Sequence, residues 1–348
     1  MHMSARLLAG LCVAAGVIGG ARESEAQAPE TSITQESLRK IIEAIPYPRA
    51  STGLPAAWRN LVKTEEYVLA EFRALGYQPT THEIEWKPSI AMREGEQRPE
   101  PPTYRNIIVE VAGSDLPEEV VVVSAHMDAA AGAPGADDDA SGLAAIIEIA
   151  RVVKDIAPSR TIRIIAFNIE EPGTVGSRQY VSSILSDGPR PKIVGAVSVE
   201  MIGYFSDEPD SQKLPVPPIE GVFEPPTVGN FIGVAGIRRH RAFHELLAGA
   251  MRESQPDLPV VLYDFLPAPV PDMLRSDHAP FLLSGYPAVM VTDTANFRNP
   301  HYHKATDSID TLDFERMTMT ARAICAGIIA AANAKTDRPA EPAAQPRD

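Results

Sequence analysis

The sequence contains few cysteines, few aromatic residues and few basic residues for its size. Among 348 residues there are 2 Cys and 6% aromatic residues, and 32 Lys and Arg stand against 46 Asp and Glu, for a formal net charge of −14. Two cysteines cannot build the disulfide framework of a small secreted domain. Because the acidic chain also lacks a basic cluster, we expect neither nucleic acid nor an anionic membrane as its partner. The hydrophobic content of 44% is enough for a large core.

The first residues have the pattern of a secretory signal peptide. Arg6 precedes an apolar run at 7–21, and a small-residue AQA segment ends at Ala28. The run is shorter than the roughly 20 apolar residues of a membrane span, so we expect no stable membrane insertion. We expect residues 1–28 to be cleaved from a secreted or periplasmic protein. The mature chain would then be a single domain over 29–334 and a disordered tail over 335–348.

Apolar, β-branched runs alternate with helical segments along the chain. The run Val120–Val123 lacks polar alternation, which is typical of a strand buried on both faces of a sheet. The alternation predicts a single α/β domain with a largely parallel sheet, compatible with antiparallel strands early in the chain. Strands are expected within 81–86, 106–113, 119–128, 161–173, 192–205, 231–236, 259–265 and 287–293. Helices are expected at 35–45, 57–75, 140–153, 177–185, 240–253 and 313–332, with a short one from Ser276 or Asp277.

Five carboxylate and imidazole side chains lie at or beyond the ends of the expected strands. They are His126, Asp138, Glu171, Glu200 and His303. Ligands of open α/β sheets collect beyond the carboxyl ends of the strands, so we expect these side chains to meet there. Hard oxygens and imidazoles without a thiolate suit Zn²⁺, Mn²⁺ or Co²⁺. The set fits two ions that share a bridging carboxylate and lie roughly 3.5–4 Å apart.

Several segments together resemble a known family. They are HMD at 126–128, PGADDDASG at 134–142, the pair Glu170 and Glu171, SDHAPF at 276–281 and NPHYHKATDSIDTLD at 299–313. In this order they are similar to the co-catalytic zinc aminopeptidases of metallopeptidase clan MH, family 28, over roughly 106–332. The resemblance implies a three-layer αβα sandwich with a mixed, mostly parallel, eight-stranded sheet. It also implies two Zn²⁺ ions per chain and a peptide substrate with a free N-terminus.

The resemblance assigns the five ligands to two ions. It implies that His126 and Glu200 hold one ion, that Glu171 and His303 hold the other, and that Asp138 bridges them. The position of Glu200 is usually an aspartate in the best-known aminopeptidases, where it also helps to receive the substrate amine. Glutamate reaches one methylene further, so Glu200 is expected to bind metal, the amine or both.

Other residues of the similar segments take supporting roles in this comparison. Glu170 resembles the general base, which takes a proton from the metal-activated water and passes it to the leaving amine. Tyr302 resembles a tyrosine that supports the tetrahedral oxyanion, or it simply packs. Asp128 is the expected acceptor for the second ring N–H of His126. Asp277 either lies behind the ligands or caps a helix.

Neighbouring acidic and histidine residues have simpler explanations than metal binding. Asp137 and Asp139 are expected to serve the loop or the start of the following helix, and the resemblance makes the peptide after Asp138 a candidate for a cis bond. His240 and His244 stand four apart on an expected helix. The zinc-protease pattern requires a glutamate directly after the first histidine, so we do not expect these two to bind metal.

Three functions are compatible with these features. The first is an exported, two-zinc aminopeptidase, which retention of the whole two-ion set favours. The second is a glutaminyl cyclase, a transferase with a similar fold that typically uses one zinc. The third is a binding protein on the same fold without catalytic activity, which would be expected to lack part of the ligand set.

Overall fold

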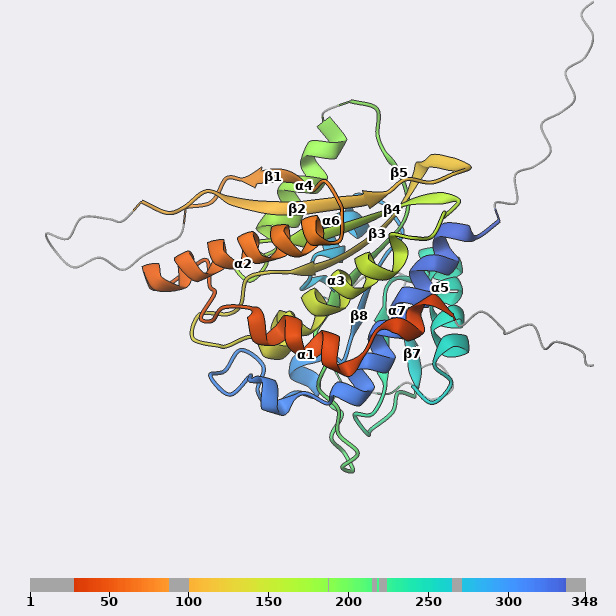
Figure 1. The fold of residues 1–348 in the computed structure, drawn as a ribbon. Coiled ribbons are helices and arrows are strands. Elements are labelled where there is room, and N and C mark those ends of the chain that lie inside the picture. Colours follow the sequence, from red (N-terminus) through yellow and green to blue (C-terminus); the bar gives the residue numbers. More distant parts are fainter. Residues whose placement is uncertain are drawn as a thin grey trace, which may run out of the picture.

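A mixed eight-stranded sheet runs through the centre of the molecule, with helices on both faces (Figure 1). The computed structural model describes residues 28–87, 100–186, 188–214, 218, 224–264 and 271–335. The expected signal peptide, apart from Ala28, and the expected tail, apart from Lys335, lie outside the described residues.

The order of the strands in the sheet is β1-β2-β4-β3-β5-β8-β6-β7. The strands are β1 (Thr80–Ile84), β2 (Tyr104–Val111), β3 (Leu116–His126), β4 (Arg160–Phe167), β5 (Lys192–Glu200), β6 (Ile232–Ala235), β7 (Val260–Tyr263) and β8 (Ala288–Thr292). Strands β4, β3, β5 and β8 are parallel neighbours, as are β6 and β7. The pairs β1–β2, β2–β4 and β6–β8 are antiparallel. The predicted α/β fold with a mixed sheet is therefore confirmed.

Helices form one layer on each face of the sheet (Figure 1). One layer contains α1 (Gln35–Ala44), α2 (Pro55–Ala74), α3 (Gly142–Val153), α5 (Arg241–Ser254) and α7 (Phe314–Asn333), and the other contains α4 (Val175–Ser186) and α6 (His278–Leu283). Successive residues of β3 point to opposite faces, so Val121 packs under the first layer and Val122 under the second. Shorter 3₁₀ or π segments are Pro29–Ser32, Ala136–Ser141, Arg238–His240, Pro271–Leu274, Ala295–Phe297 and Ile309–Thr311.

The N-terminal part of the described chain is tied to the last helix. Thr34 caps α1 through a capping box with Ser37. The Arg322 guanidinium on α7 donates to the carbonyl of Ile33 at 2.7 Å and to that of Thr31 at 3.1 Å. The two ends of the described chain therefore pack together on one face of the sheet.

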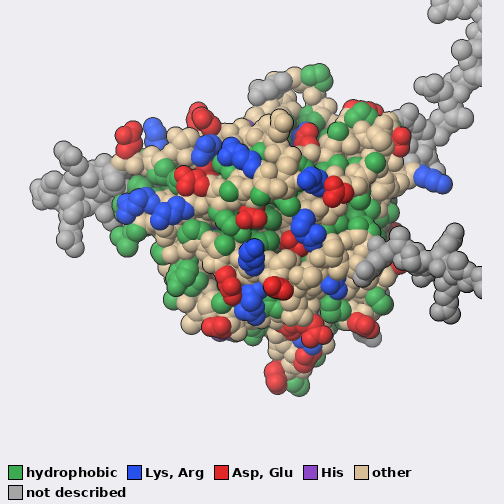
Figure 2. Space-filling view, in the orientation of Figure 1, with side chains coloured by type: hydrophobic (Ala, Val, Ile, Leu, Met, Phe, Trp, Pro, Cys, Tyr) green, Lys and Arg blue, Asp and Glu red, His purple; other side chains and the backbone are tan. Residues whose placement is uncertain are grey.

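The four parallel strands give the sheet a carboxyl edge, where β3, β4, β5 and β8 end, and an amino edge, where they begin. At the amino edge Glu119 is 1% exposed and accepts from Arg160 at 2.6 Å and from Lys192. Acidic and basic side chains are also interspersed over the helical face shown in Figure 2. None of the helices in the described ranges is both long and apolar enough to cross a membrane.

Candidate metal centre

The five predicted ligands meet at the carboxyl edge of the sheet. His126 is the last residue of β3 and Glu200 is the last residue of β5. Asp138 lies in the π segment Ala136–Ser141 before α3, and Glu171 follows the end of β4. His303 comes from the segment between β8 and α7. Neighbouring strand ends thus bring together side chains that are far apart in the sequence.

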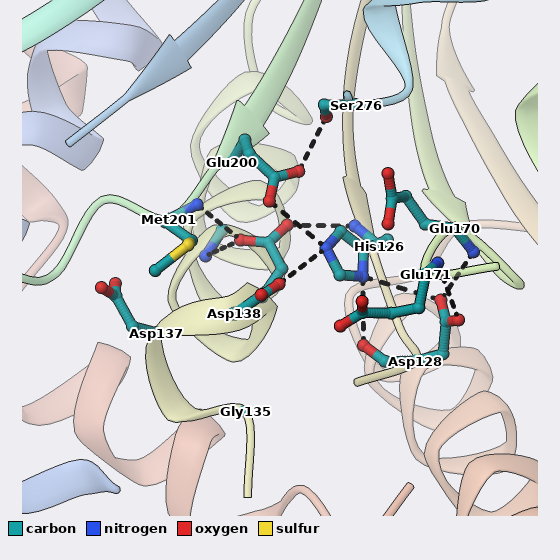
Figure 3. Close-up of polar contacts among 12 residues, drawn as sticks. His126, Asp128, Gly135, Asp137, Asp138, Glu170, Glu171, Glu200, Met201 and Ser276 are labelled. Atoms are coloured by element: carbon teal, nitrogen blue, oxygen red, sulfur yellow. Dashed lines mark hydrogen bonds and ion pairs between the residues drawn. The ribbon is translucent and has the colours of Figure 1, made fainter. Parts of the chain in front are cut away.

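Asp138 belongs to two groups of ligands at once. In the first group, Nε2 of His126 lies 3.2 Å from Oδ1 of Asp138 and 3.6 Å from Oε1 of Glu200 (Figure 3). In the second, Nε2 of His303 lies 3.2 Å from Oδ2 of Asp138 and 3.0 Å from Oε2 of Glu171. In each group the possible ligand atoms lie within 4.8 Å of one another. One carboxylate therefore directs one oxygen to each group, which is the arrangement of a bridging ligand.

The residues of both groups fit a bound metal. Three of their buried atoms, Nε2 of His126, Oδ2 of Asp138 and Oε1 of Glu171, have no hydrogen-bond partner within the described part of the chain. Buried polar atoms are normally satisfied, so these three unpaired atoms call for a partner that the described residues do not supply. Imidazole nitrogens and carboxylate oxygens without thiolate are a donor set that zinc accepts.

Protein contacts hold several ligands in orientation. Nδ1 of His126 lies 3.0 Å from the carbonyl oxygen of Asp128, and the Asp128 carboxylate is further away, at 3.6 Å. That carboxylate instead accepts the backbone N–H groups of Glu170 at 2.9 Å and Glu171 at 3.2 Å. Asp128 therefore orients His126 through its backbone and the glutamate pair through its side chain. Ser276 donates to Oε2 of Glu200 at 2.7 Å, which leaves Oε1 directed at His126.

The backbone has positive φ at or close to three of the predicted ligand positions. Ile169, just before the glutamate pair, has φ of 57°, Met201, just after Glu200, has φ of 52°, and His303 itself has φ of 55°. Residues other than glycine seldom adopt positive φ, and such strain concentrates at functional sites. The peptide between Asp138 and Asp139 is cis, as the resemblance led us to expect.

The acidic side chains of the site perturb one another. Burial lowers the pKa of His126, but Glu200, Asp128 and Asp138 outweigh it, so the pKa lies well above its usual value. Burial raises the pKa of Glu171 to about 7, and neighbouring Asp138 adds to this rise. Burial also raises the pKa of Glu170 well above its usual value, reinforced by Glu200 and Asp277. The crowded carboxylates create a strongly negative field that favours cations.

Comparison with known proteins decides the family. The model of "Peptidase family M28" matches residues 106–328. The chain belongs to peptidase family M28. Among curated relatives it is 28% identical over 292 residues to "Uncharacterized protein YfbL" of Escherichia coli, covering 81% of this chain and 83% of the relative. It is 28% identical over 244 residues to "Probable zinc metalloprotease" of Leptosphaeria maculans, covering 64% of this chain and 56% of the relative.

Solved structures share the fold of this M28 chain. The LapA aminopeptidase of Legionella pneumophila matches with a TM-score of 0.65 and 21% identity, over 90% of this chain and 76% of that one. The glutaminyl cyclase of Fimbriiglobus ruber matches with a TM-score of 0.60 and 18% identity, over 87% of this chain and 95% of that one. At these identities the matches establish the shared fold, and activity is argued below.

Tyr302 of the M28 chain packs directly against His303, one of the predicted ligands. Its ring stacks on His303, with 3.8 Å between centroids and 21° between the planes. Its hydroxyl oxygen accepts a hydrogen bond from Arg275 at 2.6 Å. Because the oxygen receives this bond, the hydroxyl proton is directed elsewhere and can be donated. Both proposed roles, packing and donation to an oxyanion, are compatible with this geometry.

The remaining acidic residues that the sequence singled out lie behind the ligands. Asp277 precedes α6 without capping it, and its carboxylate accepts from Ser177. Asp139 accepts the backbone N–H groups of His126, Gly142 and Met201, each at 3.1 Å. Asp137 accepts from Gly203 at 2.8 Å and from Asn299 at 2.7 Å. As expected for loop residues, Asp137 and Asp139 connect neighbouring segments through hydrogen bonds.

His240, which ends the 3₁₀ segment before α5, and His244, on α5, lie apart from the candidate metal centre. Nδ1 of His244 is 3.4 Å from Oδ2 of Asp264, close to the amino edge of the sheet. Neither His240 nor His244 belongs to a metal-competent group in the described ranges. Arg49 and Asp307, which contact the segments of the predicted ligands, were not singled out from the sequence, and Ser276 was considered only as the possible start of a helix. Ser276 and Asp307 lie within the similar segments, whereas Arg49 has no such signal.

Proposed function

We propose that this M28 protein is an exported zinc aminopeptidase that removes N-terminal residues from peptides with a two-ion centre. The observation that carries the proposal is Asp138, whose two oxygens face two separate histidine groups at 3.2 Å each. Two metal ions about 3.5–4 Å apart are used by aminopeptidases and also by phosphatases, polymerases and nucleases. The relative named a zinc metalloprotease and the shared fold with the LapA aminopeptidase support zinc as the metal and peptides as the substrates.

In the proposed reaction two groups of side chains would hold the metal, His126 with Glu200 and Glu171 with His303, and Asp138 would contribute to both groups. Bound zinc would supply Lewis acidity and lower the pKa of a bound water toward 7. Glu170, which is 7% exposed and lies beside His126 in Figure 3, would take the proton of that water and deliver it to the leaving amine. Tyr302 would donate a hydrogen bond from its hydroxyl to the developing oxyanion and keep its proton, since its oxygen already accepts a hydrogen bond from Arg275.

The test is a panel of fluorogenic aminoacyl amides, assayed with metal analysis on the same sample. We expect two zinc ions per chain and hydrolysis of at least one free-amine substrate. The matched N-acetylated substrates should be hydrolysed far more slowly, because they lack the terminal amine. A protein that binds two ions yet releases product from no free-amine substrate would overturn the proposal.

A glutaminyl cyclase is the second candidate, because the Fimbriiglobus ruber cyclase shares the fold at a TM-score of 0.60. This function predicts one tightly bound zinc ion and cyclisation of peptides that begin with glutamine. Mass spectrometry separates the two reactions, since cyclisation releases ammonia and leaves the peptide bonds intact. The complete ligand set on both sides of Asp138 favours the hydrolase.

Export is a separate part of the proposal, which rests on the residues before Pro29. Expression of the full chain with its first residues should yield a mature protein outside the cytoplasm. Its N-terminal sequence should begin at Pro29. Full-length protein recovered in the cytoplasm would contradict export without affecting the proposed chemistry.

A further inference from the structure

We propose that Arg49 and Asp307 are positioning residues that fix the bridging carboxylate of Asp138 before metal binds, so that the affinity for the ions depends on both. This inference rests on the proposed two-ion centre. Neither residue belongs to the ligand groups. Arg49 lies before residue 106, where the family match begins, and Asp307 lies on the segment that carries His303.

Arg49 binds backbone carbonyl groups in and near the segment 134–138. Its guanidinium donates to the carbonyl oxygens of Met127 at 2.9 Å, Pro134 at 2.5 Å and Gly135 at 2.6 Å. Its own carbonyl accepts the N–H of Ala129 at 3.1 Å. The planar guanidinium is suited to this task, because its donors have a fixed geometry that a lysine ammonium lacks.

Asp307 binds backbone N–H groups of the same segment. Its carboxylate accepts the backbone N–H of Asp137 at 2.9 Å and that of Asp138 at 3.2 Å. Its carbonyl accepts the N–H of Ala136 at 3.3 Å. Together with Arg49 it binds a polar backbone group of every residue from Pro134 to Asp138. The segment thus has its carbonyl groups fixed from the N-terminal part of the chain and its N–H groups fixed from the C-terminal part.

The segment has little room to move around these contacts. Gly135 has φ of 69°, and a Cβ at this position would lie 2.3 Å from the carbonyl oxygen of Asp138 and 2.9 Å from Nη2 of Arg49. Arg49 is 1% exposed and Asp307 is 0% exposed. The Asp138 side chain projects from this rigid segment, so its two oxygens keep their directions toward the two histidines.

The charge of Arg49 also fits this role. The acidic groups whose charges act on the buried guanidinium are Asp307, Asp138, Asp128 and Asp139, of which Asp307 acts most strongly. Without metal the converging carboxylates repel one another, and a fixed cation behind them offsets part of this repulsion. Because the guanidinium bonds go to carbonyl groups, the carboxylate oxygens of Asp138 stay available to metal.

The experiment measures metal affinity in Arg49→Met and Asp307→Asn by competition with a chromophoric zinc chelator. Residues that orient metal ligands typically change affinity 10–100-fold when replaced, and we expect a loss of about this size in each variant. Arg49→Lys keeps the positive charge and loses the planar set of guanidinium N–H donors. It should therefore recover only part of the affinity.

Arg160→Met is the matched control. Arg160 is 4% exposed at the amino edge, and like Arg49 it donates to backbone carbonyls, those of Ala331 and Ala334. We expect this variant to lose thermal stability and to keep the zinc affinity of the wild type. A general loss of stability therefore cannot account for weaker binding in Arg49→Met.

Wild-type zinc affinity in folded Arg49→Met or Asp307→Asn would overturn the inference. If Arg49→Met does not fold, Asp307→Asn, which preserves side-chain size, decides by the same criterion. Zinc affinity is measured without substrate. A protein that lacks aminopeptidase activity would therefore contradict the proposed function, and the affinities of the variants would still test the positioning role. A wild type that binds a single ion would remove the two-ion proposal, whereas weaker binding in the variants would still support the positioning role.

Discussion

The two edges of one sheet bury charge in opposite ways. At the amino edge Glu119 is paired with two cations, Arg160 and Lys192, as in an ordinary structural ion pair. At the carboxyl edge Asp138, Glu171 and Glu200 converge with two histidines, and the buried guanidinium of Arg49 bonds to backbone carbonyl groups instead of to these carboxylates. Both edges belong to the same parallel strands, so the difference comes from the residues at the strand ends.

The difference separates stability from function. Buried charge that is matched within the protein supports the fold, whereas buried charge left unmatched destabilises it and is kept where a ligand completes it. We therefore expect the carboxyl edge, unlike the amino edge, to depend on an added cation. The predictions below test this distinction.

Removal of metal should have the largest effect. Chelation is expected to abolish peptide hydrolysis and to lower the melting temperature by several degrees, because ions that bind only the native state stabilise it. Added zinc should restore both, as measured by amide hydrolysis and calorimetry. The variant Glu119→Gln should show the same drop on chelation, since its change lies at the other edge. Full activity in a sample shown to be free of metal would contradict the prediction.

Glu170→Gln should remove turnover and leave the metal in place. Loss of a general base costs about 10²–10⁴-fold in rate, and Glu170 is not a member of either ligand group. Turnover of an aminoacyl amide and zinc content are measured on one sample. Glu119→Gln is again the control, with turnover near that of the wild type. Unchanged turnover in Glu170→Gln would remove the assignment of the base.

The pH dependence of stability should have opposite signs at the two edges in the chelated protein. Burial raises the pKa of Asp277 from 3.8 to about 7. The folded state therefore keeps a proton that the unfolded state releases, and stability falls as the pH rises through this window. At Glu119 burial would raise the pKa, but Lys192 and Arg160 outweigh it and lower the pKa below 4.5. Its contribution is therefore lost as the pH falls.

Urea unfolding between about pH 3 and pH 8 measures both signs. Asp277→Asn should flatten the decline between about pH 4 and pH 7. Glu119→Gln should weaken the protein at neutral pH and reduce the loss of stability in acid. Parallel changes in the two variants would mean that the edges do not differ in the way described.

The smallest effect is expected for His244→Gln. This buried histidine is next to Asp264 near the amino edge, far along the strands from the candidate metal centre. Zinc content and zinc affinity should equal those of the wild type. A reduced metal content would mean that the amino edge also contributes to metal binding.

Much of the fold could be predicted because β-branched runs and helical periodicity are local signals. The run Val120–Val123 predicted a buried strand, and β3 covers it. The helix expected from Ala140 begins at Gly142, because a π segment precedes it. Boundaries depend on such local distortions, which no periodic pattern reports.

The site was only partly visible in the sequence. His126 and Glu200 stand where apolar runs end, so their positions could be inferred, and their role as ligands stays a prediction. Arg49 is a single arginine in a loop, and its burial results from contacts with residues about 80 positions further along. Asp307 resembles its neighbours Asp310 and Asp313 in sequence, and only the folded chain shows which one binds the Asp138 segment.

The contacts around Asp138 also bear on when the candidate metal centre forms during folding. Arg49 comes from near the start of the described chain and Asp307 from near its end, and Arg322 joins the first helical segment to the last helix. All the contacts that hold the segment of Asp138 are therefore made only after residues about 260 apart in the sequence have come together, and contacts of such long range form slowly. If the proposed two-ion site exists, we therefore expect metal to bind late in folding, after the last helix of a growing chain has left the ribosome.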